Sequence, residues 1–240
     1  MGLYLNLYKS QRDELMKGVE GVKSFYYLKL KAIEYLLTFW SGNQQPVRPF
    51  LYVDYERLHR MYIVNDDGCK IVSFGFEFRI KTYSKVVTDL DNSILALNYM
   101  GEQGEISLQN VSEALSILSE LEFKDNNYYW GVDLGVSVSN ESIRFFEKIV
   151  FSESGYIRYD NSIVGYKPPI HPRYHFDICF TPNICYKIGL PKHIVHTEME
   201  NILDKRTSCP MIDIAPSNLY YVGLNKRRQS KGGKKKNRNY

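Results

Sequence analysis

The chain has 240 residues, of which 44% are hydrophobic and 24% are charged. This composition is typical of a globular protein and excludes a fibrous or wholly disordered chain. The sequence contains no run of about 18 apolar residues that could span a bilayer, and its start lacks the continuous apolar segment of a signal peptide. We therefore expect a soluble, cytoplasmic protein without a membrane partner.

The positive charge is concentrated near the end of the sequence. Of the 31 Lys and Arg residues, eight lie between positions 226 and 238 with no acid among them, which leaves 23 basic against 27 acidic residues elsewhere. Because this segment lacks apolar residues that could form a core, we expect a disordered basic tail over 226–240. Such a tail binds RNA or DNA with salt-dependent, sequence-independent affinity; the alternative is a terminus that only aids solubility. The predicted contacts are Lys226, Arg227, Arg228, Lys231, Lys234, Lys235, Lys236 and Arg238.

Along the first half of the chain, residue spacing predicts two helices and one strand. Apolar residues recur at steps of three and four over 11–41, which predicts a long helix, although Gly18 and Gly21 weaken its first half. Aromatic residues alternate over 73–80 and predict a strand. The stretch 50–59 is too mixed to assign. A second amphipathic helix is predicted from about Ser107.

The second half predicts a strand-rich region that ends in a helix. Strict alternation predicts a strand over 130–138, and helical spacing follows over 141–150. Strands are expected at 156–160, 171–178 and 184–191, the last two forming a hairpin across Thr181, Pro182 and Asn183. A closing helix follows Pro191. Together these elements predict an α+β fold: a single domain over 1–225 with an antiparallel or mixed sheet and helices packed on one side.

Cysteine usage predicts reduced thiols rather than a disulfide framework. The four cysteines are Cys69, Cys179, Cys185 and Cys209, and their spacing is irregular. Structural zinc held by three of them with nearby histidines is a weaker alternative, because the sequence has no CxxC pair. Buried free cysteines are the favoured interpretation.

The densest group of chemically active residues lies in HPRYHFDICF, residues 171–180. In a strand, His171, Arg173, His175 and Asp177 would share one face, with apolar residues on the other. Four such side chains cannot be buried cheaply, so this face should be solvated or line a polar pocket. If the strand at 156–160 pairs with it, the same face gains two further residues, Arg158 and Asp160.

Three chemistries could use this group. His171 and His175 could act as acid and base in metal-independent phosphodiester cleavage, with an arginine stabilising the transition state. The histidines and Asp177 could instead hold a divalent metal. Alternatively, the group could bind a phosphate or a partner. The residues assigned to that third role are Arg158, Asp160, Arg173, Asp177 and Lys187.

The same segment resembles a poorly characterised group of bacterial proteins with an RYD, then HPxxHxHx, then RIP pattern, often encoded near defence loci or mobile elements. The pattern residues are Arg158, Tyr159 and Asp160, then His171, Pro172 and His175, then Lys187, Ile188 and Pro191. Asp177 stands where the pattern has its third histidine, and KIGLP replaces the compact RIP. The resemblance covers about 35 residues and implies a bacterial accessory role without a defined activity.

The leading hypothesis is an accessory protein that binds nucleic acid or a nucleoprotein partner in a bacterial defence or mobile-element system. It requires no cofactor and no metal. The first alternative is a metal-independent ribonuclease or phosphodiesterase that uses His171 and His175. The second is a purely protein-binding subunit of a larger complex.

Overall fold

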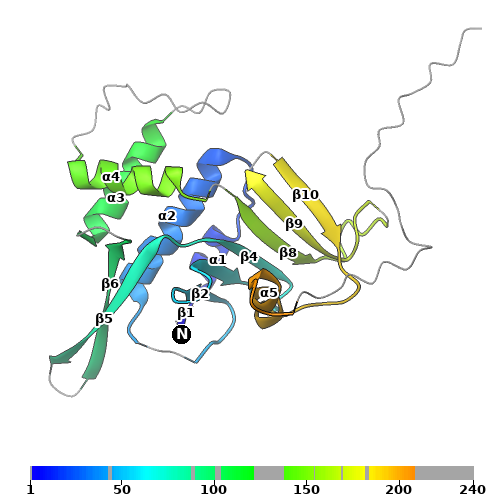
Figure 1. Ribbon diagram of the computed structural model, residues 1–240, viewed down its shortest axis with the longest axis horizontal. Coiled ribbons are helices and arrows are strands. Elements are labelled where there is room, and N and C mark those ends of the chain that lie inside the picture. Colours follow the sequence, from blue (N-terminus) through cyan, green and yellow to red (C-terminus); the bar gives the residue numbers. More distant parts are fainter. Residues whose placement is uncertain are drawn as a thin grey trace, which may run out of the picture.

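The computed structural model describes residues 2–42, 45–87, 90–100, 104–121, 138–153, 155–168, 170–181 and 184–208. Its main sheet has seven strands, and every neighbouring pair is antiparallel. In spatial order the strands are β1 (Gly2–Asn6), β2 (Phe50–Asp54), β3 (Arg60–Val64), β4 (Lys70–Gly75), β8 (Tyr156–Asn161), β9 (Tyr174–Thr181) and β10 (Ile184–Gly189). Because β8 follows β4 in space, the C-terminal hairpin extends the N-terminal sheet (Figure 1).

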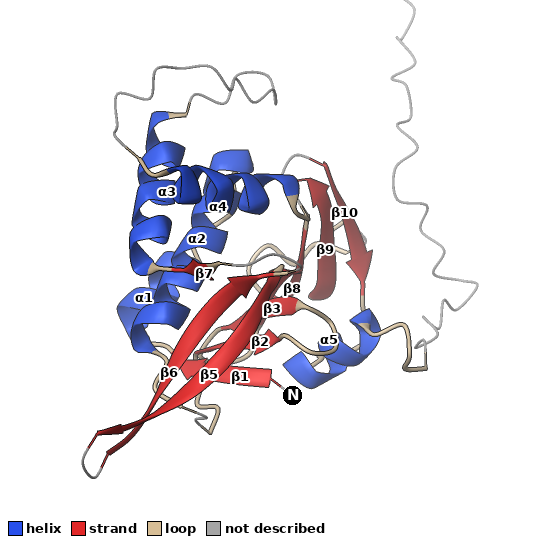
Figure 2. Cartoon of the chain, turned by 60° about the vertical axis from the view of Figure 1, so that its left-hand side comes forward, coloured by secondary structure: helices blue, strands red, loops and turns tan. Residues whose placement is uncertain are grey.

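A smaller sheet projects from this body. It consists of β5 (Phe78–Val87), β6 (Leu90–Tyr99) and β7 (Glu105–Ile106), also antiparallel. Figure 2 shows the β5–β6 hairpin extending away from the main sheet. At its base, Phe78 packs against Phe145, which ties the hairpin to the helical layer.

Helices cover both faces of the main sheet. They are α1 (Lys9–Leu15), α2 (Val22–Phe39), α3 (Leu108–Glu120), α4 (Asn140–Phe151) and α5 (His196–Leu203). Phe25 of α2 packs on Phe74 and Tyr156, and α3 and α4 pack beside α2 in the same core. The short α5 lies against the opposite face, where Met199 shares a second core with Tyr159. The predicted α+β class with an antiparallel sheet is confirmed, and α5 adds a small layer on the second face (Figures 1 and 2).

Two predicted elements are each divided in the structure. The single helix over 11–41 was wrong: α1 ends at Leu15 and α2 begins at Val22. Gly18 and Gly21 lie in the break, where each would cost a helix interior about 1 kcal/mol relative to alanine. The strand over 73–80 is also divided, between β4 and β5, with the break at Phe76 and Glu77. Glu77 turns toward a buried lysine there and leaves the strand pattern.

Several other predicted elements are confirmed. The helices expected from Ser107 and over 141–150 correspond to α3 and α4, and both begin with a serine side chain that accepts a backbone N–H. The hairpin is β9–β10, and the closing helix is α5. The strand expected at 171–178 begins only at Tyr174, so His171 and Arg173 precede it. Cys209, the basic tail and, apart from its last residue Val138, the predicted strand at 130–138 lie outside the described residues.

The expectation of reduced thiols was wrong for two cysteines. Cys179 and Cys185 form a disulfide across the β9–β10 hairpin, whereas Cys69 is free. The antiparallel register of β9 and β10 places these two residues directly opposite one another. With both sulfurs bonded to each other, neither is available as a zinc thiolate, which removes the zinc alternative that depended on them.

Replacing Cys185 with serine should lower the free energy of unfolding by about 2 kcal/mol, because the disulfide closes a short loop. Urea denaturation without reductant measures this loss. Thiol titration of the denatured chain should also find one more free thiol in the variant than in wild type. One fewer thiol would mean that Cys179 and Cys185 are both reduced in the purified protein.

Candidate functional site

Strands β8, β9 and β10 bring five charged or titratable side chains together. Cross-strand pairing places Arg158 opposite Asp177, Asp160 opposite His175, and Lys187 opposite Asp177. All five therefore project from the same face of the sheet. We call this group the β8–β10 cluster. The strands expected at 156–160 and 171–178 therefore do pair, as β8 and β9. This pairing brings Arg158 and Asp160 next to His175 and Asp177.

Asp177 is the centre of the ion pairs in the cluster. Its Oδ1 lies 2.7 Å from Lys187 Nζ, and its Oδ2 lies 2.5 Å from Arg158 Nη2. Arg158 Nε also contacts Asp160 Oδ2 at 2.6 Å, so one guanidinium joins both carboxylates. Burial alone would raise the pKa of Asp177, but the Lys187 hydrogen bond and the charge of Arg158 outweigh burial and lower it. Asp177 is therefore a stable anion at neutral pH.

His175 lies deepest in the cluster, with only 1% of its surface exposed. Its Nδ1 is 2.8 Å from the Pro172 carbonyl oxygen. Because a carbonyl can only accept, Nδ1 carries the proton and Nε2 is an acceptor. Burial, assisted by the charge of Lys187, lowers the pKa of His175 and keeps the ring neutral.

The acceptor Nε2 of His175 faces two carboxylates. It lies 3.6 Å from Asp160 Oδ2 and 3.9 Å from Asp177 Oδ2. Within the described part of the chain, this Nε2 has no hydrogen-bond donor. Nε2 and the two carboxylate oxygens therefore converge, and Arg158 donates to both oxygens but not to the ring nitrogen.

The remaining predicted residues lie on the loop over 162–173. This loop is closed by paired backbone hydrogen bonds between Lys167 and His171, at 2.9 and 2.8 Å. Gly165 adopts a φ of 80°, and a Cβ there would lie 3.3 Å from the His171 ring. The His171 and His175 rings are 4.8 Å apart, so the loop covers the edge of the β8–β10 cluster.

The 162–173 loop is mostly exposed. Arg173 holds its guanidinium 5.0 Å from the Tyr174 ring and donates a hydrogen bond to Asn161 Oδ1 at 3.1 Å. Lys167 and Tyr166 are exposed beside it. Further exposed side chains on the loop are Ile163, Val164 and Ile170. The predicted site thus divides into a buried cluster and an exposed loop.

This division changes two of the predicted roles. His175 is too deeply buried for its ring to exchange a proton directly with a polymeric substrate, so the geometry does not favour the pair of His171 and His175 as acid and base. Arg158 and Lys187 are already paired with carboxylates, which makes them weak phosphate ligands as they stand. Arg173 keeps its guanidinium accessible and remains the predicted residue best placed for an external phosphate.

Two other buried charged groups were not predicted. Lys29 Nζ contacts Glu77 Oε1 at 3.0 Å and Ser152 Oγ at 2.8 Å beneath the helical layer. On α5, burial raises the pKa of Glu200 to about 7, although the charge of Arg57 opposes this rise. The partners of Lys29 are 48 and 123 positions away, so no local pattern could reveal this group.

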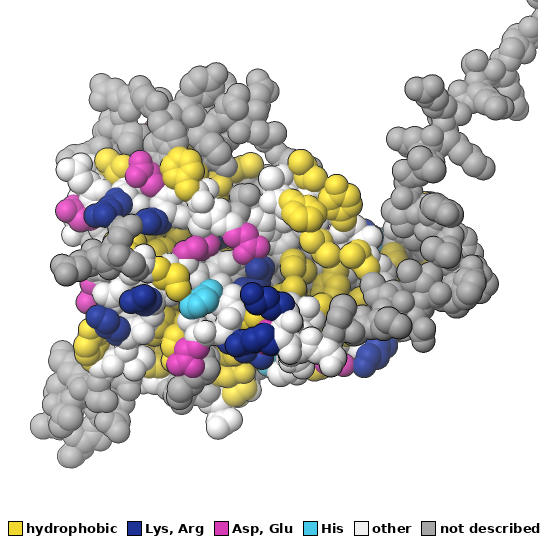
Figure 3. Space-filling view, in the orientation of Figure 1, with side chains coloured by type: hydrophobic (Ala, Val, Ile, Leu, Met, Phe, Trp, Pro, Cys, Tyr) yellow, Lys and Arg dark blue, Asp and Glu magenta, His cyan; other side chains and the backbone are white. Residues whose placement is uncertain are grey.

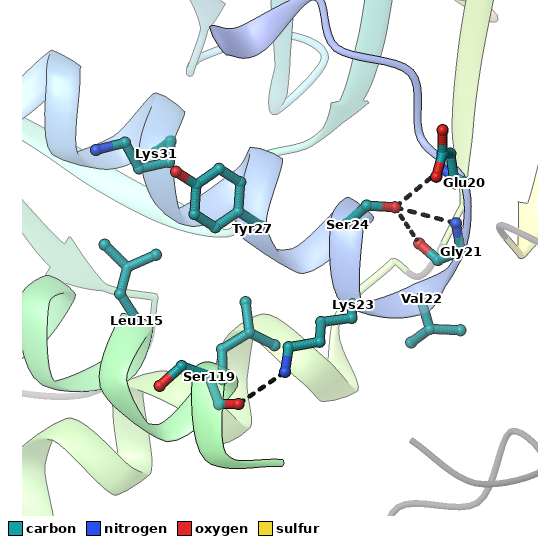
Figure 4. A pocket seen from close by; sticks show the side chains of 10 residues that line it. Glu20, Gly21, Val22, Lys23, Ser24, Tyr27, Lys31, Leu115 and Ser119 are labelled. Carbon is teal, nitrogen blue, oxygen red and sulfur yellow. Dashed lines mark hydrogen bonds between the residues drawn. The ribbon is translucent and has the colours of Figure 1, made fainter. Parts of the chain in front are cut away.

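The structure also has an open pocket of about 850 Å³ between α2 and α3. Figure 4 shows Lys23, Tyr27 and Lys31 of α2 facing Leu115 and Ser119 of α3 across it. Lys23 Nζ donates to the Ser119 carbonyl at 2.7 Å, which satisfies one of the free carbonyls at the end of α3. No residue of the β8–β10 cluster lines this pocket, and it carries no predicted site residue.

Comparison with known proteins gave no relatives. No family model, no curated protein and no solved structure matches this chain. None of the described helices combines the length and apolar character needed to cross a membrane. Any functional assignment therefore rests only on the residues of this chain and on their geometry.

Proposed function

We propose that this chain binds nucleic acid through the 162–173 loop, with the basic 226–238 segment adding affinity. The observation that carries the proposal is the loop itself, where Lys167 and Arg173 are exposed beside Tyr166. Cations that contact phosphates, together with an aromatic ring on which a base can stack, are the usual components of a single-strand binding surface. The resemblance to proteins near defence loci and mobile elements is compatible with such a role.

The two segments would contribute differently. Eight positive charges without a compensating acid bind phosphates by releasing counterions, which gives affinity that falls steeply with salt. The loop contacts fewer phosphates but offers stacking, which depends less on salt. Loss of the tail should therefore reduce the salt slope, whereas loss of a loop residue should mainly reduce affinity.

Truncation after Asn225 should weaken binding to a fluorescent single-stranded RNA or DNA and flatten the salt dependence of the affinity. Arg173→Gln in the full chain should weaken binding about tenfold, equivalent to loss of one stacked, phosphate-contacting side chain. Fluorescence anisotropy over a salt series measures both effects. The matched control is Arg144→Gln, because Arg144 is also exposed and stacks on an aromatic ring, at 6.0 Å from Tyr99, but lies on α4.

An affinity and a salt slope that are the same in the truncated and full chains would exclude the tail. Equal losses in the Arg173 and Arg144 variants would exclude the loop as a specific surface. Binding that is absent at low salt in the full chain would contradict the proposal as a whole.

A second candidate function, a protein-binding subunit, is favoured by a separate surface. Phe180, Ile184 and Tyr186 are exposed on the β9–β10 hairpin, and the rings of Phe180 and Tyr186 pack at 5.6 Å. Figure 3 views the molecule in the orientation of Figure 1, and it shows hydrophobic side chains gathered over the region where β8–β10 lie. Exposed apolar patches of this kind mark contact surfaces. The same titration separates the two candidates, because a protein-binding subunit predicts no greater loss of nucleic-acid affinity from Arg173→Gln than from Arg144→Gln.

A further inference from the structure

We propose that Asp160, His175 and Asp177 form a binding site for one divalent first-row transition metal ion. The inference is independent of nucleic-acid binding, because it rests on the buried cluster and not on the loop or the tail. One ligand atom from each residue lies within 4.8 Å of the other two. Among the residues that the structure describes, no other group of three His, Cys, Asp or Glu residues has such a spacing.

The separations suit a metal with little rearrangement. A metal about 2.1 Å from each donor holds neighbouring donors roughly 3.0–3.5 Å apart. His175 Nε2 lies 3.6 Å from Asp160 Oδ2 and 3.9 Å from Asp177 Oδ2. Contraction by a few tenths of an ångström would bring Nε2 and each oxygen to these separations, and the two carboxylate ligand oxygens, which lie within 4.8 Å of each other, would also have to approach. Two adjacent strands supply all three ligands, so the backbone does not need to move.

The state of His175 is the independent sign of a ligand. A buried acceptor without a donor costs about 1–3 kcal/mol, and His175 Nε2 is such an acceptor, aimed between two carboxylates. The Pro172 carbonyl accepts the proton on Nδ1 at 2.8 Å. Metal-binding histidines are oriented in the same manner, by a backbone carbonyl or carboxylate on the other ring nitrogen. A cation at Nε2 would satisfy the acceptor and the converging oxygens together.

Arg158 and Lys187 determine how strongly the site binds. They balance the two carboxylates, so the cluster is neutral without a metal and the fold does not require one. Arg158 contacts the same Oδ2 atoms that face His175, and it therefore competes with the metal for them. Removing its charge should tighten metal binding. One imidazole and two carboxylates favour Zn²⁺ or Mn²⁺ over Mg²⁺ and Ca²⁺, which select oxygen ligands alone.

Calorimetric titration of the EDTA-treated full chain with ZnCl₂ tests the site. Wild type should bind one equivalent that His175→Gln and Asp160→Asn each weaken more than tenfold, and Arg158→Gln should bind more tightly than wild type. His196→Gln is the matched control. His196 is also largely buried with an unpartnered Nδ1, but it packs among the rings of Tyr4, Phe50 and Tyr52 and faces no pair of carboxylates.

Three results would overturn the proposal: no stoichiometric binding by folded wild type, equal affinity in wild type and Asp160→Asn, or equal losses in the His175 and His196 variants. Circular dichroism establishes that each variant is folded. If His175→Gln does not fold, Asp160→Asn and Arg158→Gln decide the question, because a purely structural cluster predicts no change in Zn²⁺ affinity from either one.

Discussion

Replacing Glu77 with leucine should lower the free energy of unfolding by about 3–5 kcal/mol, the typical cost of removing one partner from a buried ion pair. Lys29 has only 1% of its side chain exposed, and Glu77 Oε1 is the charged acceptor of its ammonium group at 3.0 Å. After the substitution, the Ser152 hydroxyl and the Glu153 carbonyl would be its remaining acceptors. The ammonium would then remain buried without a counter-ion.

Lys29→Met should be much less harmful than Glu77→Leu. It removes the buried charge and fills a similar volume, and the Glu77 side chain that it leaves unpaired is 26% exposed, against 1% for Lys29. Burial lowers the pKa of Lys29 although Glu77 opposes this, which shows that the position disfavours charge. The double variant Lys29→Met/Glu77→Leu should therefore recover most of the stability lost by Glu77→Leu alone.

Urea denaturation of the wild type, the two single variants and the double variant gives the coupling free energy between the two residues. Lys192→Met is the matched control, because Lys192 is 71% exposed and pairs with Glu198 at the surface. It should change the free energy of unfolding by less than about 1 kcal/mol. A loss of similar size in Glu77→Leu and in the control would contradict the account of a buried pair.

The elements that the sequence predicted well are those with a strong local period. Helices α3 and α4 have one apolar face and a serine cap, and the sequence of β9–β10 has turn-forming residues between two alternating stretches. Strands β2 and β3 were missed because both of their faces are almost fully buried. A strand covered on both sides has no alternation to detect.

The candidate site was partly predictable because its strands have a clear two-residue period. Pleating places His175 and Asp177 on one face, and pairing with the strand of Arg158 and Asp160 completes the cluster. The start of β9 was not predictable, because His171 and Arg173 alternate correctly but belong to a loop closed by backbone hydrogen bonds. The orientation of His175 toward a carbonyl three residues earlier depends on that loop.

The positions of Cys179 and Cys185 around the predicted turn indicated the disulfide, although the number and spacing of the four cysteines did not. Cys179 and Cys185 flank the predicted turn at nearly equal distances, so a hairpin brings them opposite each other. Sparse, irregularly spaced cysteines argued for reduced thiols. The register of the hairpin predicts the pairing of these cysteines better than their overall spacing does, since register determines which residues face one another.

Replacing Asp177 with asparagine should lower the free energy of unfolding at pH 7 by about 2 kcal/mol. The substitution leaves Lys187 without its carboxylate and Arg158 with Asp160 alone. The loss should lie below that for a fully buried pair, because both cations are partly exposed and water can solvate them. The measurement is urea denaturation in EDTA, so that no bound metal contributes.

The pH dependence of this loss identifies its cause. Asp177 has a lowered pKa in the folded chain, so it contributes stability above the unfolded value of about 3.9 and loses it as pH falls through the folded value. The difference between wild type and Asp177→Asn should therefore be largest near neutral pH and shrink below about pH 4. Asparagine does not titrate, so the variant lacks this component of acid sensitivity.

Asp13→Asn is the matched control, since Asp13 pairs with Arg12 but is 57% exposed. It should cost less than about 1 kcal/mol at every pH. A loss in Asp177→Asn that stays constant between pH 7 and pH 3 would show that packing, and not charge, holds the cluster. A loss that disappears with acid would instead show that the β8–β10 cluster is held by the charge on Asp177. The anion that Zn²⁺ binding requires is then present at neutral pH before any metal enters.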